Sequence, residues 1–427
     1  MDELESIMKR CLEKKKDFLP AVVLGAYGMA GPYINETSEK DWQSAWHSLP
    51  EHMKSESPSF IASRPAQSML STVMVFELFK KMTGVQEPHQ TKHIYLMNME
   101  TLEGRWHPFK PHPLATQNIS TEKMNIEEGS LNHVKDQNEW LYYFGELTAS
   151  PLGIFYQWEE GDLEQLPLSL CGVQVVHARS QKLTPEIIAG GKTHEEARRE
   201  AGFMGVEAYA KTLEGEILQS LVPHAESPRR FPDDAFHIGA GESYTESSLR
   251  ALQKAVENVW TEDHHKAKKA RKFTLRTIED EDCRYYWQVL KTMDKEPELA
   301  ISEDGFGFPM VWVKTPHSKW RGTVALHQTL AVRQALFLLL MEKQMEGLPT
   351  AYSFRSCSQL YFEKESMASF DLPSMEAKDN KEVLRGAVTQ LEKGQHKPSF
   401  VKISMDPFEE DGVIDLCGVW LERGDSV

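Results

Sequence analysis

Residues 239–260 read "GAGESYTESSLRALQKAVENVW", and they match the earlier stretch "GGKTHEEARREAGFMGVEAYAK" (190–211) at an offset of 50 residues. Small residues followed by a helical pattern indicate a turn that leads into an amphipathic helix. The sequence therefore predicts a strand-turn-helix unit that occurs twice, with a carboxylate at the same place in each helix. The matching pairs are Gly191 with Gly241, Thr193 with Ser243, Ala197 with Ser247, and Glu207 with Glu257.

A fainter third copy lies at 324–344, "VALHQTLAVRQALFLLLMEKQ". Matching Ala325 to the two glycines places Ala331 over Ala197 and Ser247, and Met341 over the two glutamates. Apolar runs that predict strands lie before or after the copies, at 173–178, 308–315, 400–405 and 413–422. This alternation is typical of an α+β sheet with helices packed on one face.

Chain length and net charge indicate the number of domains and argue against some classes of partner. A chain of 427 residues exceeds the roughly 250–300 at which single cores stop growing, so we expect two domains. A formal net charge of −16 argues against nucleic acid or an anionic membrane as partner, because phosphates require clustered Lys and Arg. The one basic run, 264–273, follows a helix and is interpreted as a solvated cationic helix end.

Cysteine spacing and the apolar runs indicate a cytoplasmic protein. The five cysteines lie far apart and form no C-x-x-C pair, which excludes a disulfide framework and a zinc ribbon. The charged start of the chain is not a signal peptide. The most apolar run, 330–344, contains Arg333 and is shorter than the roughly 20 residues that a bilayer requires, so it predicts a buried core helix.

The chain divides into a first unit (1–112), a polar linker (113–139) and a second unit (140–427). In the first unit the patterns predict a strand at 21–27, a helix at 64–84 with Pro65 in its first turn and Gly84 past its end, and a hairpin at 93–109. The second unit opens with "WLYYFGELTASPLGIFYQWEEGD" (140–162), interpreted as another hairpin.

Two family resemblances account for these units. The stretches "FLPAVVLGAYGMAGPYI" (18–34), "PAQSMLSTVMVFELFKKMTG" (65–84) and "HIYLMNMETLEGRW" (93–106) make the first unit similar to the second half of a ThiF-type adenylating fold. This implies an α/β unit whose nucleotide-binding front half would precede Met1. The second unit resembles a YcaO domain, which activates peptide amides with ATP, and the implied fold class is α/β plus α+β.

The second unit departs from the YcaO pattern S-x-x-x-E-x-x-E-R. Glu207 matches its second Glu, whereas Glu200, Met204 and Ala208 stand where Ser, the first Glu and Arg are expected. In the second copy Glu257 remains, with Lys254 and Asn258 where further carboxylates are expected. Magnesium requires several oxygen ligands, so the resemblance implies a degenerate domain.

Taken together, the blocks 18–32, 99–114, 151–171 and 192–209 make the chain similar to ThiF-like thiazole-containing bacteriocin maturation proteins. The chain resembles a member that lacks the N-terminal part. The resemblance implies a role in making azole rings on Cys, Ser or Thr side chains of a ribosomal peptide (RiPP biosynthesis).

The residues themselves predict no catalytic constellation, no metal site and no bound cofactor. Pro108, Pro111 and Pro113 interleave His107 and His112, so we interpret these histidines as loop anchors, and His264 and His265 as solvent-exposed. Glu207, Glu257 and Lys192 are the candidate remnants of a cofactor site. Each glutamate can instead accept hydrogen bonds from the neighbouring small-residue turn. We favour this structural role over a role in a cofactor site.

The sequence leaves three functional hypotheses. The favoured one is a non-catalytic adaptor whose partners are a YcaO-type cyclodehydratase and the precursor peptide, with a homodimer as a further possibility. The second is an ATP-dependent cyclodehydratase in which Glu207, Glu257 and Lys192 converge. The third is a structural dimerisation scaffold.

Overall fold

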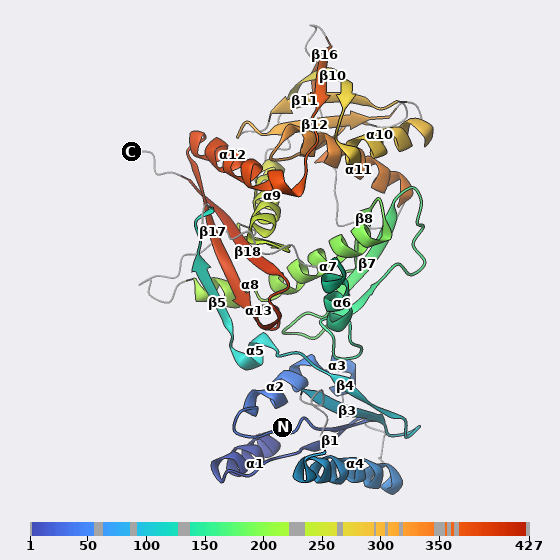
Figure 1. Cartoon of the computed structure of the whole chain (residues 1–427), viewed down its shortest axis with the longest axis vertical. Coiled ribbons are helices and arrows are strands. Elements are labelled where there is room, and N and C mark those ends of the chain that lie inside the picture. The colour runs from blue at the N-terminus through green and yellow to red at the C-terminus, as the bar shows by residue number, and fades with distance from the viewer. Residues whose placement is uncertain are drawn as a thin grey trace.

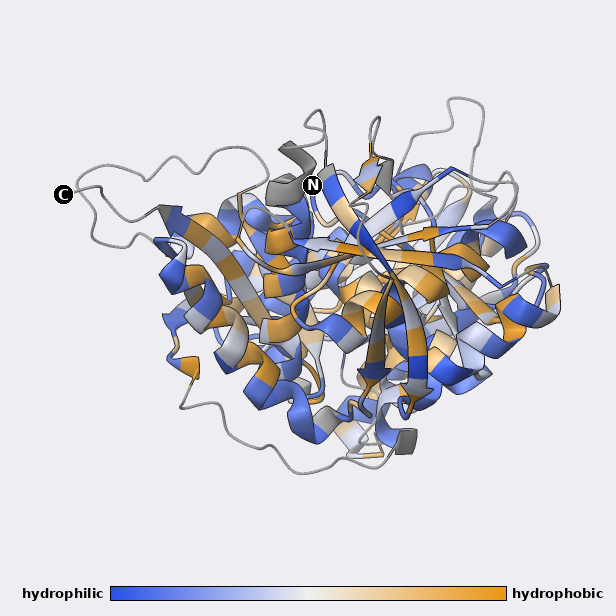
Figure 2. Cartoon of the chain, turned by 90° about the horizontal axis from the view of Figure 1, so that it is seen from above, coloured by the Kyte–Doolittle hydropathy of each residue, from blue (hydrophilic) through white to orange (hydrophobic). Residues whose placement is uncertain are grey.

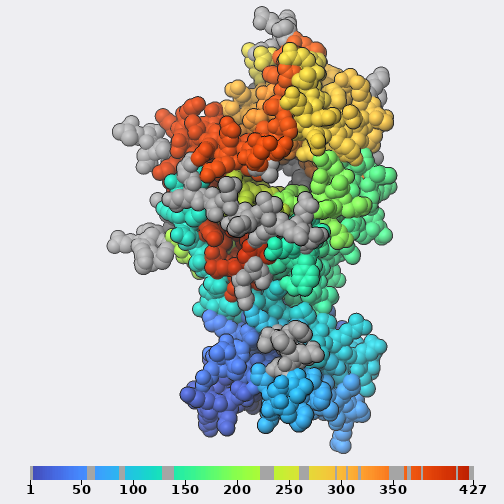
Figure 3. All heavy atoms as spheres, in the orientation of Figure 1, coloured from blue at the N-terminus to red at the C-terminus, as the bar shows by residue number. Residues whose placement is uncertain are grey.

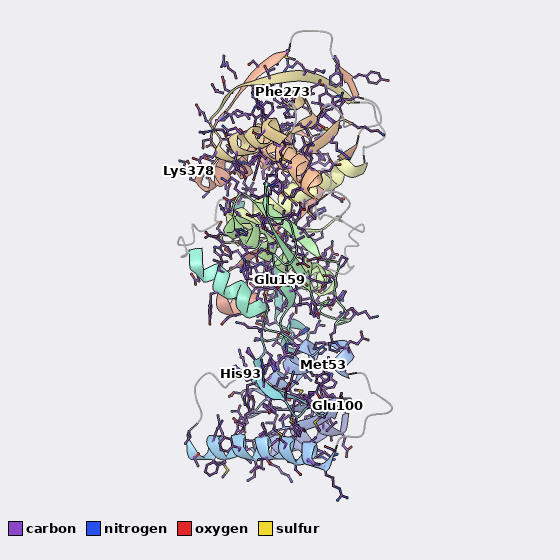
Figure 4. All side chains as sticks on the ribbon, turned by 90° about the vertical axis from the view of Figure 1, so that its right-hand side faces the viewer. Met53, His93, Glu100, Glu159, Phe273 and Lys378 are labelled. Carbon is purple, nitrogen blue, oxygen red and sulfur yellow. The ribbon has the colours of Figure 1, made fainter. Side chains whose placement is uncertain are left out.

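The computed structural model describes residues 2–54, 63–85, 92–126, 137–221, 235–262, 268–293, 296–303, 306–315, 319–345, 355–356, 360–362 and 367–423. Figure 1 shows an elongated molecule, with the first unit at one end and the second unit as a larger body beside it. In Figure 4, Met53, His93 and Glu100 mark the first unit, and Glu159 and Phe273 mark the second. The architecture is mixed α/β with several separate sheets.

The first unit is a four-stranded antiparallel sheet in the order β1-β2-β3-β4. The hairpin predicted at 93–109 is confirmed, because β3 pairs with β4 and Tyr95 lies opposite Trp106. The single strand predicted at 21–27 is wrong: the chain turns at Gly25, whose φ is +55°, and forms a two-stranded hairpin. The elements are α1 (Asp2–Glu13), β1 (Ala21–Leu24), β2 (Tyr27–Ala30), α2 (Glu39–Ser48), α3 (Glu51–Lys54), α4 (Arg64–Thr83), β3 (His93–Asn98) and β4 (Gly104–Pro108).

Helix α4 begins and ends at the residues that the sequence predicts. The Ser63 hydroxyl accepts a hydrogen bond from the amide of Ala66, and Pro65 occupies the first turn. Gly84 follows the last helical residue with φ +69°, a left-handed conformation that glycine adopts at low cost.

The segment predicted as a linker contains regular secondary structure. It contains α5 (Pro113–Thr116) and β5 (Ile119–Lys123), and β5 pairs antiparallel with β17 (His396–Met405). Residues 119–123 therefore belong to a sheet of the second unit, while 127–136 lie outside the described residues.

The hairpin predicted at 140–162 is also wrong. Residues 137–147 form α6 (Gln137–Leu147), and only β6 (Phe155–Glu159) is a strand. Trp140, Phe144 and Leu147 are buried, and their spacing places them on one face of a helix. Packing on this face outweighs the preference of aromatic residues for strands.

The repeated strand-turn-helix unit is present in all three predicted copies: β8 (Ile187–Gly191) with α7 (His194–Lys211), β9 (His237–Gly241) with α9 (Tyr244–Glu262), and β13 (Arg321–Val324) with α11 (Gln328–Gln344). The Thr193 and Ser243 hydroxyls accept hydrogen bonds from the amides of Glu196 and Glu246. The two glutamates reach back to amides before their helices, as in a capping box. Hence the same short pattern starts α7 and α9.

Among the described residues, the strands of the second unit form three sheets, whereas the sequence predicted one. Their strand orders are β6-β7-β8, β5-β17-β18-β9 and β14-β13-β12-β11-β10-β15, and β16 also pairs with β10. The four strands predicted from apolar runs are confirmed as β7, β12, β17 and β18. The further elements are β7 (Ser169–Val175), α8 (Glu214–Ser220), β10 (Lys268–Ile278), α10 (Glu281–Met293), β11 (Glu298–Glu303), β12 (Pro309–Lys314), β14 (Arg355–Ser356), β15 (Leu360–Phe362), β16 (Ala368–Leu372), a 3-10 turn (Ala377–Asp379), α12 (Asn380–Lys393), α13 (Phe408–Asp411) and β18 (Asp415–Arg423).

The described part of the basic run at 264–273 is a strand and not the predicted helix end. From Lys268 it belongs to β10, which pairs with β11 on one side and with β15 and β16 on the other. Ala270 and Phe273 are buried, while Lys272 pairs with Glu298 at 2.6 Å. Residues 263–267, which include both histidines of this run, lie outside the described residues.

Apolar residues are frequent on the central strands and on the helices beside them (Figure 2). The core helix predicted at 330–344 is confirmed as α11, in which Leu336, Leu339 and Leu340 are buried. Among the described helices, none combines the length and the apolar character that a bilayer-spanning segment needs.

Candidate functional site

The C-terminal halves of α7 and α9 border one pocket of about 420 Å³. Glu207 from α7 and Glu257 from α9 both line it, so the structure brings together two of the three candidate residues. Met204 and Ala208, which replace the Glu and Arg of the YcaO pattern, line the same pocket. The lining residues are Ile187, Met204, Glu207, Ala208, Lys211, Phe236, His237, Ile238, Lys254, Glu257 and Asn258.

Glu207 is buried, with 4% of its surface exposed, and its carboxylate is bonded to the second copy. Oε1 accepts hydrogen bonds from the Ala240 amide at 3.0 Å and from Arg250 Nε at 2.8 Å. Oε2 accepts a hydrogen bond from Lys254 Nζ at 2.7 Å. Both oxygens are therefore occupied by donors from β9 and α9.

These contacts also provide hydrogen bonds to backbone groups on the edge of β9 that faces away from β18. On its other edge β9 pairs with β18. The Ala240 amide donates to Glu207, and the Ile238 carbonyl accepts from Lys254 Nζ at 2.7 Å. Unpaired backbone groups are costly when buried. The Glu207–Lys254 pair thus supplies hydrogen bonds that a neighbouring strand would otherwise provide.

Arg250 extends the ion-pair network to a second carboxylate. Its Nη1 lies 2.7 Å from Glu200 Oε2, so one guanidinium bridges two glutamates of α7. The guanidinium carbons of Arg199 and Arg250 lie 4.6 and 5.5 Å from the centre of the Phe203 ring, within the range of cation–π attraction. Helices α7 and α9 are locked together by charge as well as by apolar packing.

Burial would by itself raise the pKa of Glu207, but the charges and hydrogen bonds of Arg250 and Lys254 outweigh burial and lower this pKa to about 2. A carboxyl group with a lowered pKa stabilises the fold above its unfolded pKa, near 4.5, and this stabilisation is lost as the pH falls toward 2. A shift of this size corresponds to about 3 kcal/mol.

We therefore expect the stability difference between the wild-type protein and a Glu207→Gln variant to shrink as the pH falls from 4.5 toward 2. Urea unfolding of both proteins at several pH values measures it. A difference that stays constant over this interval would show that the charge of Glu207 does not contribute.

Glu257 accepts hydrogen bonds from two side-chain amides. Its Oε1 accepts hydrogen bonds from Gln253 Nε2 at 2.7 Å and from Gln334 Nε2 at 2.8 Å. Gln334 belongs to α11, so Glu257 connects the second copy to the third.

Lys192 is not among the residues that line this pocket. It precedes α7, and its Nζ lies 2.5 Å from Asp282 Oδ1 of α10. Arg333 of α11 contacts Asp282 at 3.3 Å and also pairs with Asp280. The convergence of Lys192 with the two glutamates, which the enzyme hypothesis requires, is therefore not observed.

The residues of the pocket do not fit the magnesium site that the YcaO resemblance implies. Magnesium needs several oxygen ligands at short range, and both oxygens of Glu207 already accept hydrogen bonds. Lys211 and Lys254 add positive charge to the same lining. In the part of the chain that the structure describes, no group of three or more His, Cys, Asp or Glu is arranged to hold a metal ion.

The two histidines predicted to anchor the proline-rich segment each contact a backbone group, His107 from β4 and His112 from the position before α5. His107 Nδ1 lies 3.0 Å from the Ser150 carbonyl. His112 is buried, and its Nδ1 accepts a hydrogen bond from the Leu114 amide at 3.3 Å. Burial, with the nearby charges of His47 and Lys54, lowers the pKa of His112 to about 3, so His112 is neutral in the folded protein.

The sequence interpretation missed the partners of the two glutamates, Arg250 and Gln334. A signal was present in the repeat itself. Gln334 follows Arg250 by 84 residues, the offset that relates Ala325 to Gly241. Arg250 of the second copy binds Glu207 of the first, and Gln334 of the third binds Glu257 of the second.

Comparison with solved structures shows that this architecture is similar to that of heterocyclases. A heterocyclase in complex with substrate and cofactor aligns with a TM-score of 0.64 at 12% identity, over 98% of this chain and 74% of the other. The heterocyclase TruD aligns with a TM-score of 0.58 at 13% identity, over 100% of this chain and 73% of the other. The chain has the heterocyclase fold. No family profile and no curated protein sequence matches it.

Proposed function

We propose that this chain is a non-catalytic partner in the maturation of a thiazole- or oxazole-containing peptide. It recruits the precursor peptide, a separate YcaO-type cyclodehydratase, or both. In this proposal the first unit is the second half of a ThiF-type fold, and the second unit is a degenerate YcaO-like domain. The heterocyclase fold supports the reaction class.

The hydrogen bonds that Glu207 accepts are the observation that supports this proposal most directly. Its carboxylate is the one side chain that matches the YcaO pattern in the first helix, and it accepts hydrogen bonds from Arg250, Lys254 and the Ala240 amide. A metal ion bound there would have to displace two cations and an amide. The group is therefore committed to holding α7, β9 and α9 together.

The test is reconstitution with the partner enzyme and precursor. We expect the purified chain alone to hydrolyse no ATP, and expect it to increase ring formation when it is added to the cyclodehydratase. Mass spectrometry follows ring formation as the loss of one water for each azoline. Precursor-dependent ATP hydrolysis by this chain alone would contradict the proposal.

The alternative is that the chain is itself an ATP-dependent cyclodehydratase. Two observations favour it: the alignment with heterocyclases over almost the whole chain, and the presence of Glu207 and Glu257 in one pocket. On this alternative, calorimetry with ATP and magnesium detects binding to the purified chain. A pull-down of precursor and cyclodehydratase separates the adaptor from a purely structural scaffold, because a scaffold binds neither.

A further inference from the structure

Helix α4 leaves most of its apolar residues uncovered. It buries Ala66 and Leu70, whereas Val75 is 67% exposed, Phe79 59% and Met82 80%. Figure 4 shows α4 along the end of the molecule that is farthest from the second unit, and Figure 3 shows this end as outer surface. A helix that is apolar beyond the stripe it buries is expected to have a second covering surface.

The uncovered residues follow the spacing of a helix-pairing seam. Residues 68, 72, 75, 79 and 82 alternate in steps of four and three, the a/d spacing with which one helix packs along another. All five are exposed. The N-terminal positions are small, Ser68 and Thr72, and the C-terminal positions are the larger Val75, Phe79 and Met82.

This distribution of sizes fits a second α4 in antiparallel orientation. With the twofold axis midway between Thr72 and Val75, each Phe79 lies beside the partner's Ser68, and each Val75 lies beside the partner's Thr72. The Thr72 hydroxyl already donates to the Ser68 carbonyl at 2.8 Å. It can therefore be buried at the contact without losing its partner.

The exposed apolar area of α4 is large enough to form the centre of a twofold interface. Taking roughly 150–250 Å² for a fully buried large side chain, Val75, Phe76, Leu78, Phe79 and Met82 at their observed exposures present on the order of 500 Å². That is as large as the largest patch on a typical monomer. It supplies more than half of the roughly 800 Å² per partner that a standard interface buries.

We infer that the chain forms a homodimer in which two α4 helices pack antiparallel across a twofold axis, the bulky half of each against the small half of the other. The same patch is used on both subunits, as a twofold interface requires. This inference is independent of the proposed role in peptide maturation.

Light scattering after size-exclusion chromatography, over a concentration series of the full chain, tests the inference. We expect twice the chain mass of 48.8 kDa for the wild-type protein. Phe79→Glu places a charge in the bulky half, and Thr72→Arg fills the small half. Each is expected to weaken dimerisation at least 100-fold.

Leu166→Glu is the matched control, because Leu166 is 82% exposed and lies outside α4; this variant is expected to stay dimeric. Circular dichroism and urea midpoints check that every variant folds. A monomeric wild-type protein, or a dimer that survives Phe79→Glu, overturns the inference. A dimer broken by Phe79→Glu and unaffected by Thr72→Arg overturns it as well, because the antiparallel register places Thr72 in the contact.

Discussion

Replacing Glu207 by glutamine is expected to lower the free energy of unfolding by about 3–5 kcal/mol, the usual cost of removing one partner from a buried ion pair. Glutamine keeps the shape of the side chain but removes its charge. Arg250 then retains Glu200, and Lys254 retains the Ile238 carbonyl. Urea unfolding at neutral pH, followed by circular dichroism, measures the change.

Glu257→Gln is the matched control for this prediction. Gln253 and Gln334, which donate to Glu257 Oε1, are uncharged, and an amide oxygen can accept the same hydrogen bonds. We expect a loss below about 1 kcal/mol, the net value of an ordinary hydrogen bond. If both variants lost the same free energy of unfolding, the charge of Glu207 would contribute no more to stability than that of Glu257.

The same pair of variants separates the two functional hypotheses. If Glu207 is a ligand of an ATP site, its replacement abolishes turnover and leaves stability nearly unchanged. If Glu207 is part of the framework, stability falls and there is no turnover to lose. A stable Glu207→Gln protein that has lost precursor-dependent ATP hydrolysis would establish the enzyme hypothesis.

The sequence predicted the repeated units because their signals are local. The capping pattern at Thr193 and Ser243 acts over a few positions, and the structure shows it in the first two copies. The strand-turn-helix unit itself is present in all three copies. The partners of Glu207 come from 33 to 47 residues further along the chain. Nothing in the residues adjacent to Glu207 specifies these partners, so its role required the tertiary structure.

The errors lie where tertiary packing overrides local preference. In α6 the aromatic residues suggested a strand, and Phe144 lies instead on the helix face that contacts Phe155 and Phe203. In β10 the charges suggested a helix end, and pairing with β11 and β16 on both sides makes a strand. Strand pairing depends on partners that are distant in sequence. Local sequence patterns therefore did not show that the described strands of the second unit form three sheets.

Gly239→Ala is expected to cost about 3 kcal/mol or more, because β9 and α9 touch through this glycine. A Cβ at this position would lie 2.1 Å from the Ser247 carbonyl oxygen and 2.5 Å from the Ala251 nitrogen. These are backbone atoms of α9, so no rotamer change relieves the overlap, and the cost reaches or exceeds the upper end of the 1–3 kcal/mol usual for overpacking. Relief requires α9 to move away from β9, which displaces Arg250 and Lys254 from Glu207.

Gly386→Ala is the control for this variant, since a Cβ at this position in α12 meets no atom within 4 Å apart from its chain neighbours and the backbone of its own helix. Alanine in a helix interior is expected to stabilise the protein by about 0.5–1 kcal/mol. Thermal and urea unfolding of both variants should therefore shift in opposite directions. The first copy carries Ala189 where the second has Gly239, so α7 tolerates on β8 the methyl group that α9 excludes on β9. If Gly239→Ala proved as stable as the wild-type protein, the close approach of α9 to β9 would not be required to hold Arg250 and Lys254 on Glu207.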